Sequence, residues 1–465
     1  MKLTADLKEA KHIHLIGVGG SGMCGLARIL LAYGYRVSGS DVKENNVARE
    51  LQAMGAKIVF EHNAENIDGA DVVVVSSAID TCNPEIEAAR SKNIPVILRA
   101  QMLGALMRLQ KGIAIAGTHG KTTTTSLVTD LLREGGLNPS FVIGGMLNSG
   151  GKYADLGSGD FFVAEADESD ASFLHLNPEI TVVTNIDQDH MVTYADNFAK
   201  LQQTFLDFLR KLPASGLAVL CLDDPGIKQI LSQIDRPFVT YGFAKDADVR
   251  VEDWQQIGTK CEFSIVRNGR DSLKVKLNLP GKHNALNALA AIAVATECGV
   301  TDADICKGLE NFKGVGRRFQ VYEREICYKT VTLIDDYGHH PQEIAVTVDA
   351  IRQAWPNRRL VLAFQPHRYT RTKALFKDFA EVLSEVDVLL LLDVYSAGED
   401  YIVGADSKSL CDSIKNKNGK EVVFVKEVDA LPFELQKVLK DDDVLLIQGA
   451  GSIGKMADYF ISQSN

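Results

Sequence analysis

The sequence predicts an α/β protein built from parallel sheets, with a length that suits about three domains. The chain has 465 residues, enough for each of three domains to bury its own core. From Ile13 to Leu98, and again from about Gln320, short β-rich runs alternate with helical stretches, a rhythm that predicts parallel strands with helices on both faces. Glycine-rich turns follow several of these strands, where such sheets bind ligands.

Composition limits the function classes. Hydrophobic residues make up 46% and charged residues 24%, as in ordinary globular proteins. The net charge of −11 argues against a nucleic-acid partner. Eight cysteines without a C-x-x-C pair suit reduced thiols, the N-terminus lacks the apolar core of a signal peptide, and no apolar run approaches the ~18 residues of a membrane span. We therefore expect a cytoplasmic protein without a membrane partner.

The N-terminal region predicts a nucleotide site. Its expected strands are Ile13–Ile16, Tyr35–Gly39, Val72–Val75 and Val96–Leu98. The turn after the first strand carries a G-x-G-x-x-G pattern, with the sequence Gly17, Val18, Gly19, Gly20, Ser21 and Gly22. Asp41 follows the second strand at about the 20-residue spacing of a ribose-binding carboxylate. This pattern alone fits NAD, but a helix N-terminus accepts any diphosphate, and a purely structural glycine turn is the weaker alternative.

A phosphate loop is expected where the apolar run from Ile113 to Ala116 meets a helical pattern. The loop consists of Gly117, Thr118, His119, Gly120, Lys121, Thr122 and Thr123. Its glycines allow close approach of an anion, Lys121 reaches terminal phosphates, and the Thr122 hydroxyl suits Mg²⁺. The spacing is shorter than in the standard loop, since Ile115 stands where the first glycine is expected. The alternative is a glycine turn with a solvated lysine.

Acidic residues follow the next predicted strand, Phe161–Ala164. Glu165 directly after the strand favours Mg²⁺ coordination beside a phosphate loop. For Asp167, Glu168 and Asp170 we expect capping of the following helix instead. A further strand, Ile180–Thr184, leads to a polar tip that ends at His190, so that consecutive strands carry polar residues at their ends.

The rest of the middle region adds a hairpin and an alanine-rich helix. The hairpin joins Phe263–Val266 to Leu273–Leu277 around Asn268-Gly269. Near the start of the helix from Ala285 to Cys298, Asn284 and Asn287 suit either capping or contact with a purine base. A boundary loop then carries Arg317 and Arg318, whose guanidinium groups suit phosphate contact, although exposed arginines are usually solvated.

In the C-terminal region, several predicted strands end in polar clusters, which we expect to face one crevice. These strands are Val331–Ile334, Leu360–Phe364, Val388–Leu392 and Val444–Gln448. Pro341 is placed to open a helix, and Arg368 and Arg371 suit a bidentate clamp on a carboxylate. A second G-x-G-x-x-G begins at Gly449, but too few residues follow it for another ribose-binding strand, so a close turn is expected there.

Together these motifs resemble the Mur ligase family. The matching stretches run in order across almost the whole chain: 17–23, 117–125, 165–170, 185–190, 281–291, 314–319, 335–341, 365–371 and 449–454. The resemblance implies a UDP-sugar-binding Rossmann-like domain at 1–108, a central ATP-binding domain at 109–319 and a C-terminal Rossmann-like ligase domain at 320–465. It also redirects the first glycine loop from NAD to UDP.

The resemblance further implies the residues of each site. Those implied for catalysis are Lys121, His190, His339, Arg368 and Arg371. Those implied to contact ATP are Gly117, Thr118, His119, Gly120, Lys121, Thr122, Thr123, Asn284, Arg318 and Asp336. Those implied for the UDP-sugar are Gly17, Gly19, Gly20, Ser21, Gly22, Asp41, Tyr337, His339 and His367. Those implied for Mg²⁺ are Thr122, Glu165 and His190.

The implied reaction is ATP-dependent ligation of L-alanine to the lactyl carboxylate of UDP-N-acetylmuramate through an acyl phosphate, in a monomer or weak homodimer. Three alternatives remain open at this point. The first is an NAD-dependent oxidoreductase that uses the N-terminal glycine loop. The second is a non-catalytic regulator that uses the Lys121 loop as a switch. The third is a relative that attaches a preformed peptide to the same UDP-sugar.

Overall fold

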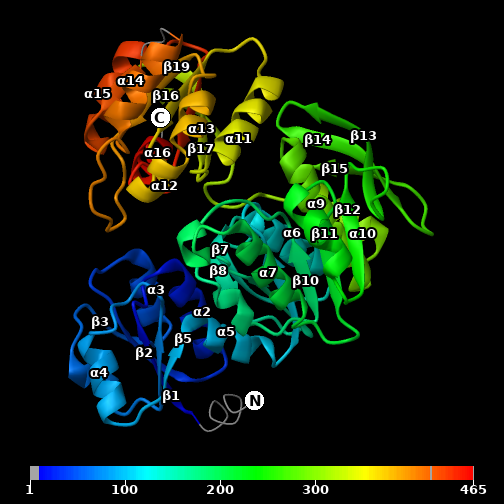
Figure 1. Ribbon diagram of the computed structural model, residues 1–465, viewed down its shortest axis with the longest axis vertical. Coiled ribbons are helices and arrows are strands. Elements are labelled where there is room, and N and C mark those ends of the chain that lie inside the picture. Colours follow the sequence, from blue (N-terminus) through cyan, green and yellow to red (C-terminus); the bar gives the residue numbers. More distant parts are fainter. Residues whose placement is uncertain (1–9, 419–421, 464–465) are drawn as a thin grey trace. The chain divides into compact units, whose positions relative to one another are not determined.

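The protein has three β-sheets with helices packed against them (Figure 1), which confirms the expected α/β class. The computed structural model describes residues 10–418 and 422–463. The chain forms two compact units, and each is described by itself. The first comprises Met1–Trp254, Glu262–Leu277 and Asn284–Lys313, and the second comprises Gln255–Cys261, Asn278–His283 and Gly314–Asn465.

The N-terminal sheet has five parallel strands in the order β3-β2-β1-β4-β5. Its elements are β1 (His12–Ile16), α2 (Ser21–Ala32), β2 (Arg36–Ser40), α3 (Asn46–Ala53), β3 (Lys57–Val59), η1 (Ala64–Ile67), β4 (Val72–Val75), α4 (Pro84–Ser91), β5 (Val96–Leu98) and α5 (Arg99–Met107). The four predicted strands are all present. The short β3 was missed, because three residues at a sheet edge show too little periodicity to predict a strand.

One face of this sheet packs on α4 and η1. Val73 and Val75 of β4 alternate onto that face and meet Ile86 and Ala89 of α4 and Ile67 of η1. The strand order reverses direction at β1, which lies between β2 and β4. Such a switch point opens a crevice at the carboxyl ends of the strands. The glycine loop after β1 lies at this crevice.

The ten-stranded sheet has the order β15-β14-β13-β12-β11-β10-β6-β9-β7-β8. Its strands are β6 (Lys111–Ala116), β7 (Ser140–Leu147), β8 (Lys152–Asp155), β9 (Phe161–Glu165), β10 (Ile180–Val183), β11 (Leu217–Cys221), β12 (Phe238–Gly242), β13 (Val249–Ile257), β14 (Lys260–Arg267) and β15 (Leu273–Leu277). The helical elements of this region are α6 (Lys121–Glu134), η2 (Ser172–His175), η3 (Met191–Tyr194), α7 (Phe198–Leu209), α8 (Pro225–Ile230), η4 (Leu231–Gln233), α9 (Lys282–Glu297) and α10 (Asp302–Asn311). The predicted hairpin strands are neighbours in this sheet.

The register of this sheet places three strand ends together. β6 lies between β10 and β9 and runs parallel to both. Ala116, the last residue of β6, is opposite Val183, and Ile115 is opposite Glu165. Residues that follow these three strands therefore emerge at the same edge.

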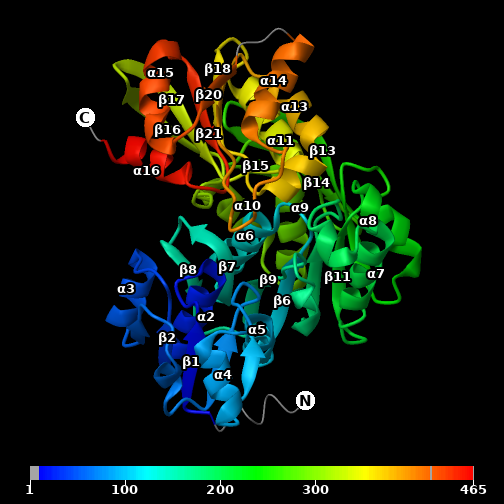
Figure 2. The same cartoon turned by 60° about the vertical axis from the view of Figure 1, so that its left-hand side comes forward.

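The third sheet has the order β16-β17-β21-β18-β19-β20 and is parallel except for the β16–β17 pair. Its elements are β16 (Gln320–Ile326), β17 (Lys329–Asp336), α11 (Pro341–Ala354), β18 (Leu360–Phe364), α12 (Tyr369–Ala374), α13 (Phe376–Leu383), β19 (Val388–Leu392), α14 (Ser407–Asn418), β20 (Val422–Val425), η5 (Val428–Ala430), α15 (Leu431–Val438), β21 (Val444–Gln448) and α16 (Gly454–Ser462). Helices cover both faces, with α13 and α14 on one side and α15 and α16 on the other (Figure 2).

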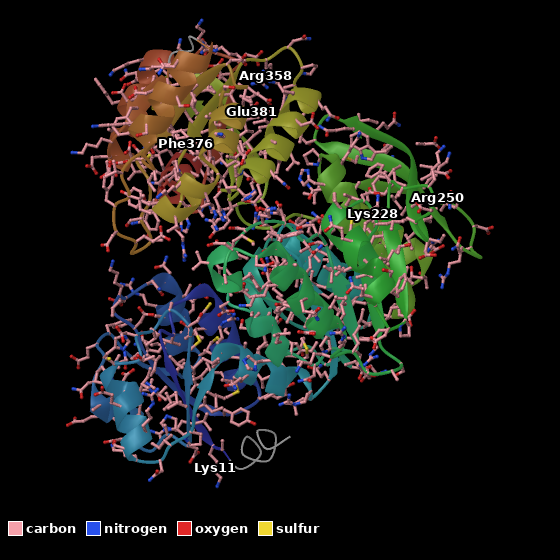
Figure 3. The ribbon with its side chains drawn as sticks, in the orientation of Figure 1. Lys11, Lys228, Arg250, Arg358, Phe376 and Glu381 are labelled. Atoms are coloured by element: carbon pink, nitrogen blue, oxygen red, sulfur yellow. The ribbon has the colours of Figure 1, made fainter. Side chains whose placement is uncertain are left out.

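Charged side chains such as Lys228 and Glu381 are exposed at the outside of these layers (Figure 3). All eight cysteines are free thiols. Within the described part of the chain, no helix combines the length and apolar character needed to cross a membrane.

Candidate active site

The predicted phosphate loop joins β6 to α6, and its glycines are required by the geometry. Gly117 has φ of 125°, and a Cβ there would lie 2.1 Å from Thr184 Oγ1. Gly120 has φ of 82°, and a Cβ there would lie 2.5 Å from Asn287 Oδ1. Only glycine adopts these backbone angles without strain. The loop is therefore a tight turn at the start of α6, where backbone N–H groups and the helix dipole favour an anion.

The Lys121 ammonium points back over this loop. It donates to the backbone carbonyls of Gly117 at 2.6 Å and Thr118 at 3.1 Å. It also contacts both carboxylate oxygens of Glu168, at 3.0 and 2.8 Å. The expectation that Glu168 caps a helix is thus wrong, because its side chain is 2% exposed and bound to Lys121. Sequence reasoning missed this contact, since the two residues lie 47 positions apart.

The charge states of this pair follow from its surroundings. Burial raises the pKa of the Glu168 carboxyl to about 7, although the Lys121 ammonium opposes the rise. Burial alone would lower the pKa of Lys121, but the negative charges of Glu168, Asp167 and Glu165 outweigh it and raise that pKa. Above about pH 7 the two side chains therefore form a buried ion pair.

The other acids of this segment have separate partners. Glu165, at the end of β9, accepts a hydrogen bond from the Gly144 N–H of β7 at 2.8 Å. Asp167 accepts one from Ser169 N, and Asp170 accepts one from Ser172 N at the start of η2. Neither residue is the N-cap of η2, which is Ala171, so the expected capping is not found for Asp167, and Asp170 bonds to the first residue of the helix from outside it. A Cβ on Gly144 would lie 2.7 Å from Glu165 Oε2, so the bare glycine leaves the space that the carboxylate occupies.

The segment after β10 supports the loop from its other side. Asn185 accepts from the His119 N–H at 2.8 Å and donates to the His119 carbonyl at 2.9 Å. The His119 ring lies 3.1 Å from an Asp187 carboxylate oxygen. His190, with φ of 55°, lies 3.4 Å from the Asp189 carboxylate. The polar tip of β10 is therefore part of the phosphate-loop structure.

The predicted Mg²⁺ ligands all belong to this unit, and two of them fit the ion well. Mg²⁺ prefers oxygen ligands, one or two carboxylates together with phosphate oxygens. Glu165 supplies a carboxylate that lies near enough to affect the Lys121 pKa, and Thr122 supplies a hydroxyl in the first turn of α6. His190 offers a ring nitrogen, which suits softer metals better.

The first two turns of helix α9 pack against the start of α6, close to the same loop. Thr124 Oγ1 donates to Asn287 Oδ1 at 3.2 Å, and Asn287 Nδ2 donates to Asn284 Oδ1 at 3.2 Å. Both asparagines are buried. Since α9 begins at Lys282, Asn284 lies inside the first turn and is not its N-cap. Asn284 therefore does not cap α9, which excludes one of its two expected roles. Asn287 supports the phosphate loop through its contact with Thr124.

The N-terminal glycine loop opens α2 in a similar way. Asp41 accepts from the Gly19 N–H at 2.8 Å, and Asn45 donates to the Gly19 carbonyl at 3.2 Å. The side chain of Ser21 lies outside the described residues. The Arg99 side chain covers the start of α2, since a Cβ on Gly22 would lie 3.2 Å from it. Arg99 is a cation at this helix N-terminus that sequence reasoning did not select.

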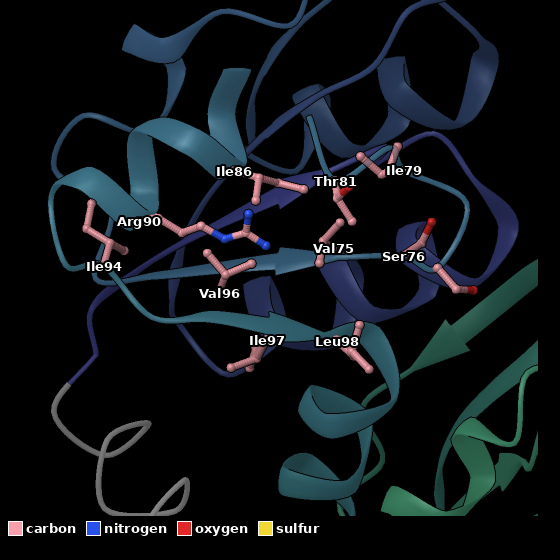
Figure 4. Close-up of a pocket in the computed structure, with 11 residues that line it drawn as sticks. Val75, Ser76, Ile79, Thr81, Ile86, Arg90, Ile94, Val96, Ile97 and Leu98 are labelled. Carbon is pink, nitrogen blue, oxygen red and sulfur yellow. The ribbon is translucent and has the colours of Figure 1, made fainter. Parts of the chain in front are cut away.

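A cavity of 450 Å³ adjoins this loop; it extends between α4 and β5 and reaches the carboxyl end of β4 (Figure 4). Its lining is mostly aliphatic, and the Arg90 side chain extends from α4 between Ile86 and Val96. Ile79 lines the cavity and also lies 3.2 Å from the position of a Cβ on Gly17. The cavity and the glycine loop are therefore neighbours.

In the second unit, the carboxyl ends of β17, β21 and β18 share one edge, since Asp336 is opposite Gln448 and Gln448 is opposite Phe364. Asp336 accepts hydrogen bonds from Phe319 N, Gly338 N and Gln448 Nε2 and is 7% exposed. The expected gathering of polar clusters at this edge is confirmed. Asp336 itself acts inside the unit, where it ties three segments together.

Tyr337 is packed between cationic and aromatic groups of this edge. The guanidinium carbons of Arg317 and Arg318 lie 5.3 and 5.1 Å from its ring centre. Its ring is also 5.5 Å from His339, and His339 is 5.7 Å from His367. The predicted Tyr337, His339 and His367 thus form one continuous cluster of rings.

Arg368 and Arg371 have different partners. Arg371 is buried and lies 3.4 Å from both the ring nitrogen and the carbonyl of His367. Arg368 is partly exposed and 3.8 Å from the Glu399 carboxylate. Each guanidinium thus contacts a different neighbour, and the two-arginine clamp stays a prediction.

The second G-x-G-x-x-G forms the close turn expected of it. A Cβ on Gly451 would lie 2.5 Å from Gln365 Oε1, and one on Gly454 would lie 2.6 Å from the Arg317 guanidinium carbon. The Arg317 guanidinium also donates to the Gly449 carbonyl at 2.7 Å. These glycines allow close packing of the turn against Gln365 and Arg317 at this edge of the sheet.

Comparison with known proteins agrees with this geometry. Three family models match in order: the Mur ligase family catalytic domain at 12–111, the Mur ligase middle domain at 115–295 and the Mur ligase glutamate ligase domain at 317–451. They cover most of the chain and match the three sheets.

Solved structures give the same result. The UDP-N-acetylmuramate–alanine ligase of Thermotoga maritima is 30% identical, with a TM-score of 0.82 over 98% of this chain and 99% of that one. The UDP-N-acetylmuramate:L-alanyl-γ-D-glutamyl-meso-diaminopimelate ligase of Neisseria meningitides is 32% identical, with a TM-score of 0.61 over 66% of this chain and 99% of that one. A murein peptide ligase of Psychrobacter arcticus is 23% identical, with a TM-score of 0.72 over 97% of this chain and 98% of that one, and supports the fold. The chain belongs to the Mur ligase family, whose members are ATP-dependent ligases that form amide bonds in peptidoglycan synthesis.

Proposed function

We propose that this protein ligates L-alanine to the lactyl carboxylate of UDP-N-acetylmuramate, with ATP converted to ADP and phosphate. The observation that carries the proposal is the phosphate loop at the β6–α6 junction, with the Lys121 ammonium over the loop and Glu165 at the adjacent strand end. The similarity to an alanine ligase over nearly the whole of both chains supports L-alanine as the acceptor. Membership of a ligase family argues against the NAD-dependent oxidoreductase.

In the proposed reaction, the carboxylate attacks the γ-phosphate of ATP, forms an acyl phosphate and releases ADP. The neutral amine of alanine then attacks the acyl carbon, and phosphate leaves as the amide forms. Lys121 neutralises charge on the transferred group. Glu165 and Thr122 would hold Mg²⁺, which neutralises further phosphate charge when bound.

We propose that the UDP-sugar binds to the N-terminal sheet, at the point next to β1 where the strand order reverses. Its diphosphate suits the start of α2, where the helix dipole and Arg99 provide positive charge. The neighbouring cavity of 450 Å³ is of the size that holds a small ligand. We also propose that the chain divides into a UDP-sugar-binding domain, an ATP-binding domain and a ligase domain, with boundaries at 108/109 and 319/320.

The test is phosphate release by the full-length protein with ATP, Mg²⁺ and UDP-N-acetylmuramate, in parallel with L-alanine, glycine, L-serine or the tripeptide L-alanyl-γ-D-glutamyl-meso-diaminopimelate. We expect L-alanine to give the highest kcat/KM. The tripeptide tests the second candidate, a peptide-adding ligase, which the 32% identity to such an enzyme favours. Release with the tripeptide alone would replace the alanine proposal by the peptide one, and release with none of the acceptors would refute both.

A further inference from the structure

Glu168 is the carboxylate in direct contact with the phosphate-loop lysine, and the proposed reaction gives it no role. Its two oxygens lie 3.0 and 2.8 Å from Lys121 Nζ, while the Gly117 and Thr118 carbonyls lie 2.6 and 3.1 Å away. The ammonium has three N–H groups and here meets four acceptors. Lys121 is therefore fully engaged within the protein.

Glu168 is fixed through its own backbone. Its carbonyl accepts hydrogen bonds from the Tyr194 hydroxyl and from Ala171 N. Thr193 Oγ1 donates to the adjacent Ser169 carbonyl at 2.6 Å. Tyr194 is 1% exposed, so these contacts belong to a packed region. The backbone of Glu168 is thereby held in place, so its carboxylate can follow the lysine only as far as rotation of the side chain allows.

The two oxygens of a carboxylate meet a cation much as two oxygens of a phosphate group do. We propose that Glu168 is a positioning residue that binds the Lys121 ammonium and competes with nucleotide phosphates for it. This inference rests on the proposed function, because it requires that a nucleotide binds at the loop.

The competition has a consequence for affinity. When phosphates take over the lysine, the buried Glu168 carboxylate loses hydrogen bonds to its principal cation while Asp167 stays close. A buried charge without its partner is unfavourable. Glu168→Gln keeps the size of the side chain and removes the charge, so this variant should release Lys121 to a nucleotide more readily.

The experiment is calorimetric titration of ADP into the full-length protein in excess EDTA, so that metal ligands make no contribution. We expect Glu168→Gln to lower the Kd for ADP roughly fivefold, since hydrogen bonds to a charged partner exceed neutral ones by about 1 kcal/mol, which corresponds to about fivefold in Kd. In the Lys121→Met background the same exchange should change Kd less than twofold, because the ammonium for which carboxylate and phosphate compete is missing. Asp160→Asn, which removes an exposed acid before β9, is the matched charge control and should leave Kd unchanged.

A Glu168→Gln variant that binds ADP no better than the wild type would overturn the inference. An equal gain in the Lys121→Met background would also overturn it, because general charge repulsion would then explain the effect. If Glu168→Gln fails to fold, Glu168→Asp is the second variant, because it keeps the charge but draws the carboxylate back by one methylene. We expect Glu168→Asp to lower the Kd for ADP by a smaller factor than Glu168→Gln. Absence of ADP binding by the wild type both in EDTA and with Mg²⁺ present would refute the proposed function itself, whereas binding without the Glu168 effect refutes the inference alone.

Discussion

Replacing Gly144 by alanine is expected to impair catalysis by displacing Glu165. A Cβ at this position would lie 2.7 Å from Glu165 Oε2 and 3.3 Å from the carboxyl carbon. Ordinary van der Waals contact begins at 3.4 Å, so the carboxylate has to move by roughly 0.7 Å to relieve the overlap. Gly144 is exposed and has no positive φ, so the backbone tolerates alanine.

The expected rate loss follows from this displacement. Misplacement of a catalytic group by 1 Å costs about a hundredfold in rate. For the smaller shift at Glu165 we expect kcat to fall about tenfold to a hundredfold, or about 1.4 to 2.7 kcal/mol in activation free energy. The loss should lessen at high Mg²⁺ concentration if the displaced carboxylate mainly weakens metal binding.

The assay is phosphate release at saturating substrates over a range of Mg²⁺ concentrations, together with ADP titration in EDTA. Binding of ADP without metal should be unchanged, because Glu165 then contributes no ligand. Gly150→Ala is the matched control, since a Cβ at Gly150 meets nothing within 4 Å. A Gly144→Ala enzyme with the kcat and Mg²⁺ dependence of the wild type would refute the metal role of Glu165.

Three further predictions follow from the geometry. Gly117→Ala should abolish detectable ADP binding in a titration, because its φ of 125° and a Cβ contact of 2.1 Å with Thr184 force the loop apart; unchanged binding would contradict the loop assignment. Arg99→Met should raise KM for UDP-N-acetylmuramate about tenfold, the loss of one charged contact, with KM for ATP unchanged; the reverse pattern would place Arg99 elsewhere. Glu85 is fully buried, and although burial opposes it, hydrogen bonds including one from Ser40 lower its pKa. The ionised Glu85 therefore stabilises the fold above the ordinary carboxyl pKa, and this contribution is lost as the pH falls through the lower pKa of the folded state. We expect Glu85→Gln to lower the free energy of unfolding by about 1–3 kcal/mol at pH 7, measured by denaturant unfolding. Below about pH 4 the loss should be smaller. A pH-independent difference would contradict that assignment.

The sequence alone determined those features that depend on neighbouring residues. Strands such as Val72–Val75 and Leu360–Phe364 were predicted with their observed limits, because continuous β-branched or aliphatic runs bounded by turn residues leave little choice of structure. The phosphate loop was also readable, since strand, glycines, lysine and helix follow one another within ten residues. Both glycines that the loop needs were identified.

Only the tertiary structure decided which distant side chains meet. Glu168 was expected to cap a helix, but β9 lies beside β6 and brings it to Lys121. Arg99, the first residue of α5, reaches the start of α2 because α5 and α2 lie side by side, although they are far apart in the sequence. Strand order and register set these distances, and neither is encoded in local periodicity. The sequence therefore specified the phosphate loop, whereas packing selected the carboxylate that holds its lysine.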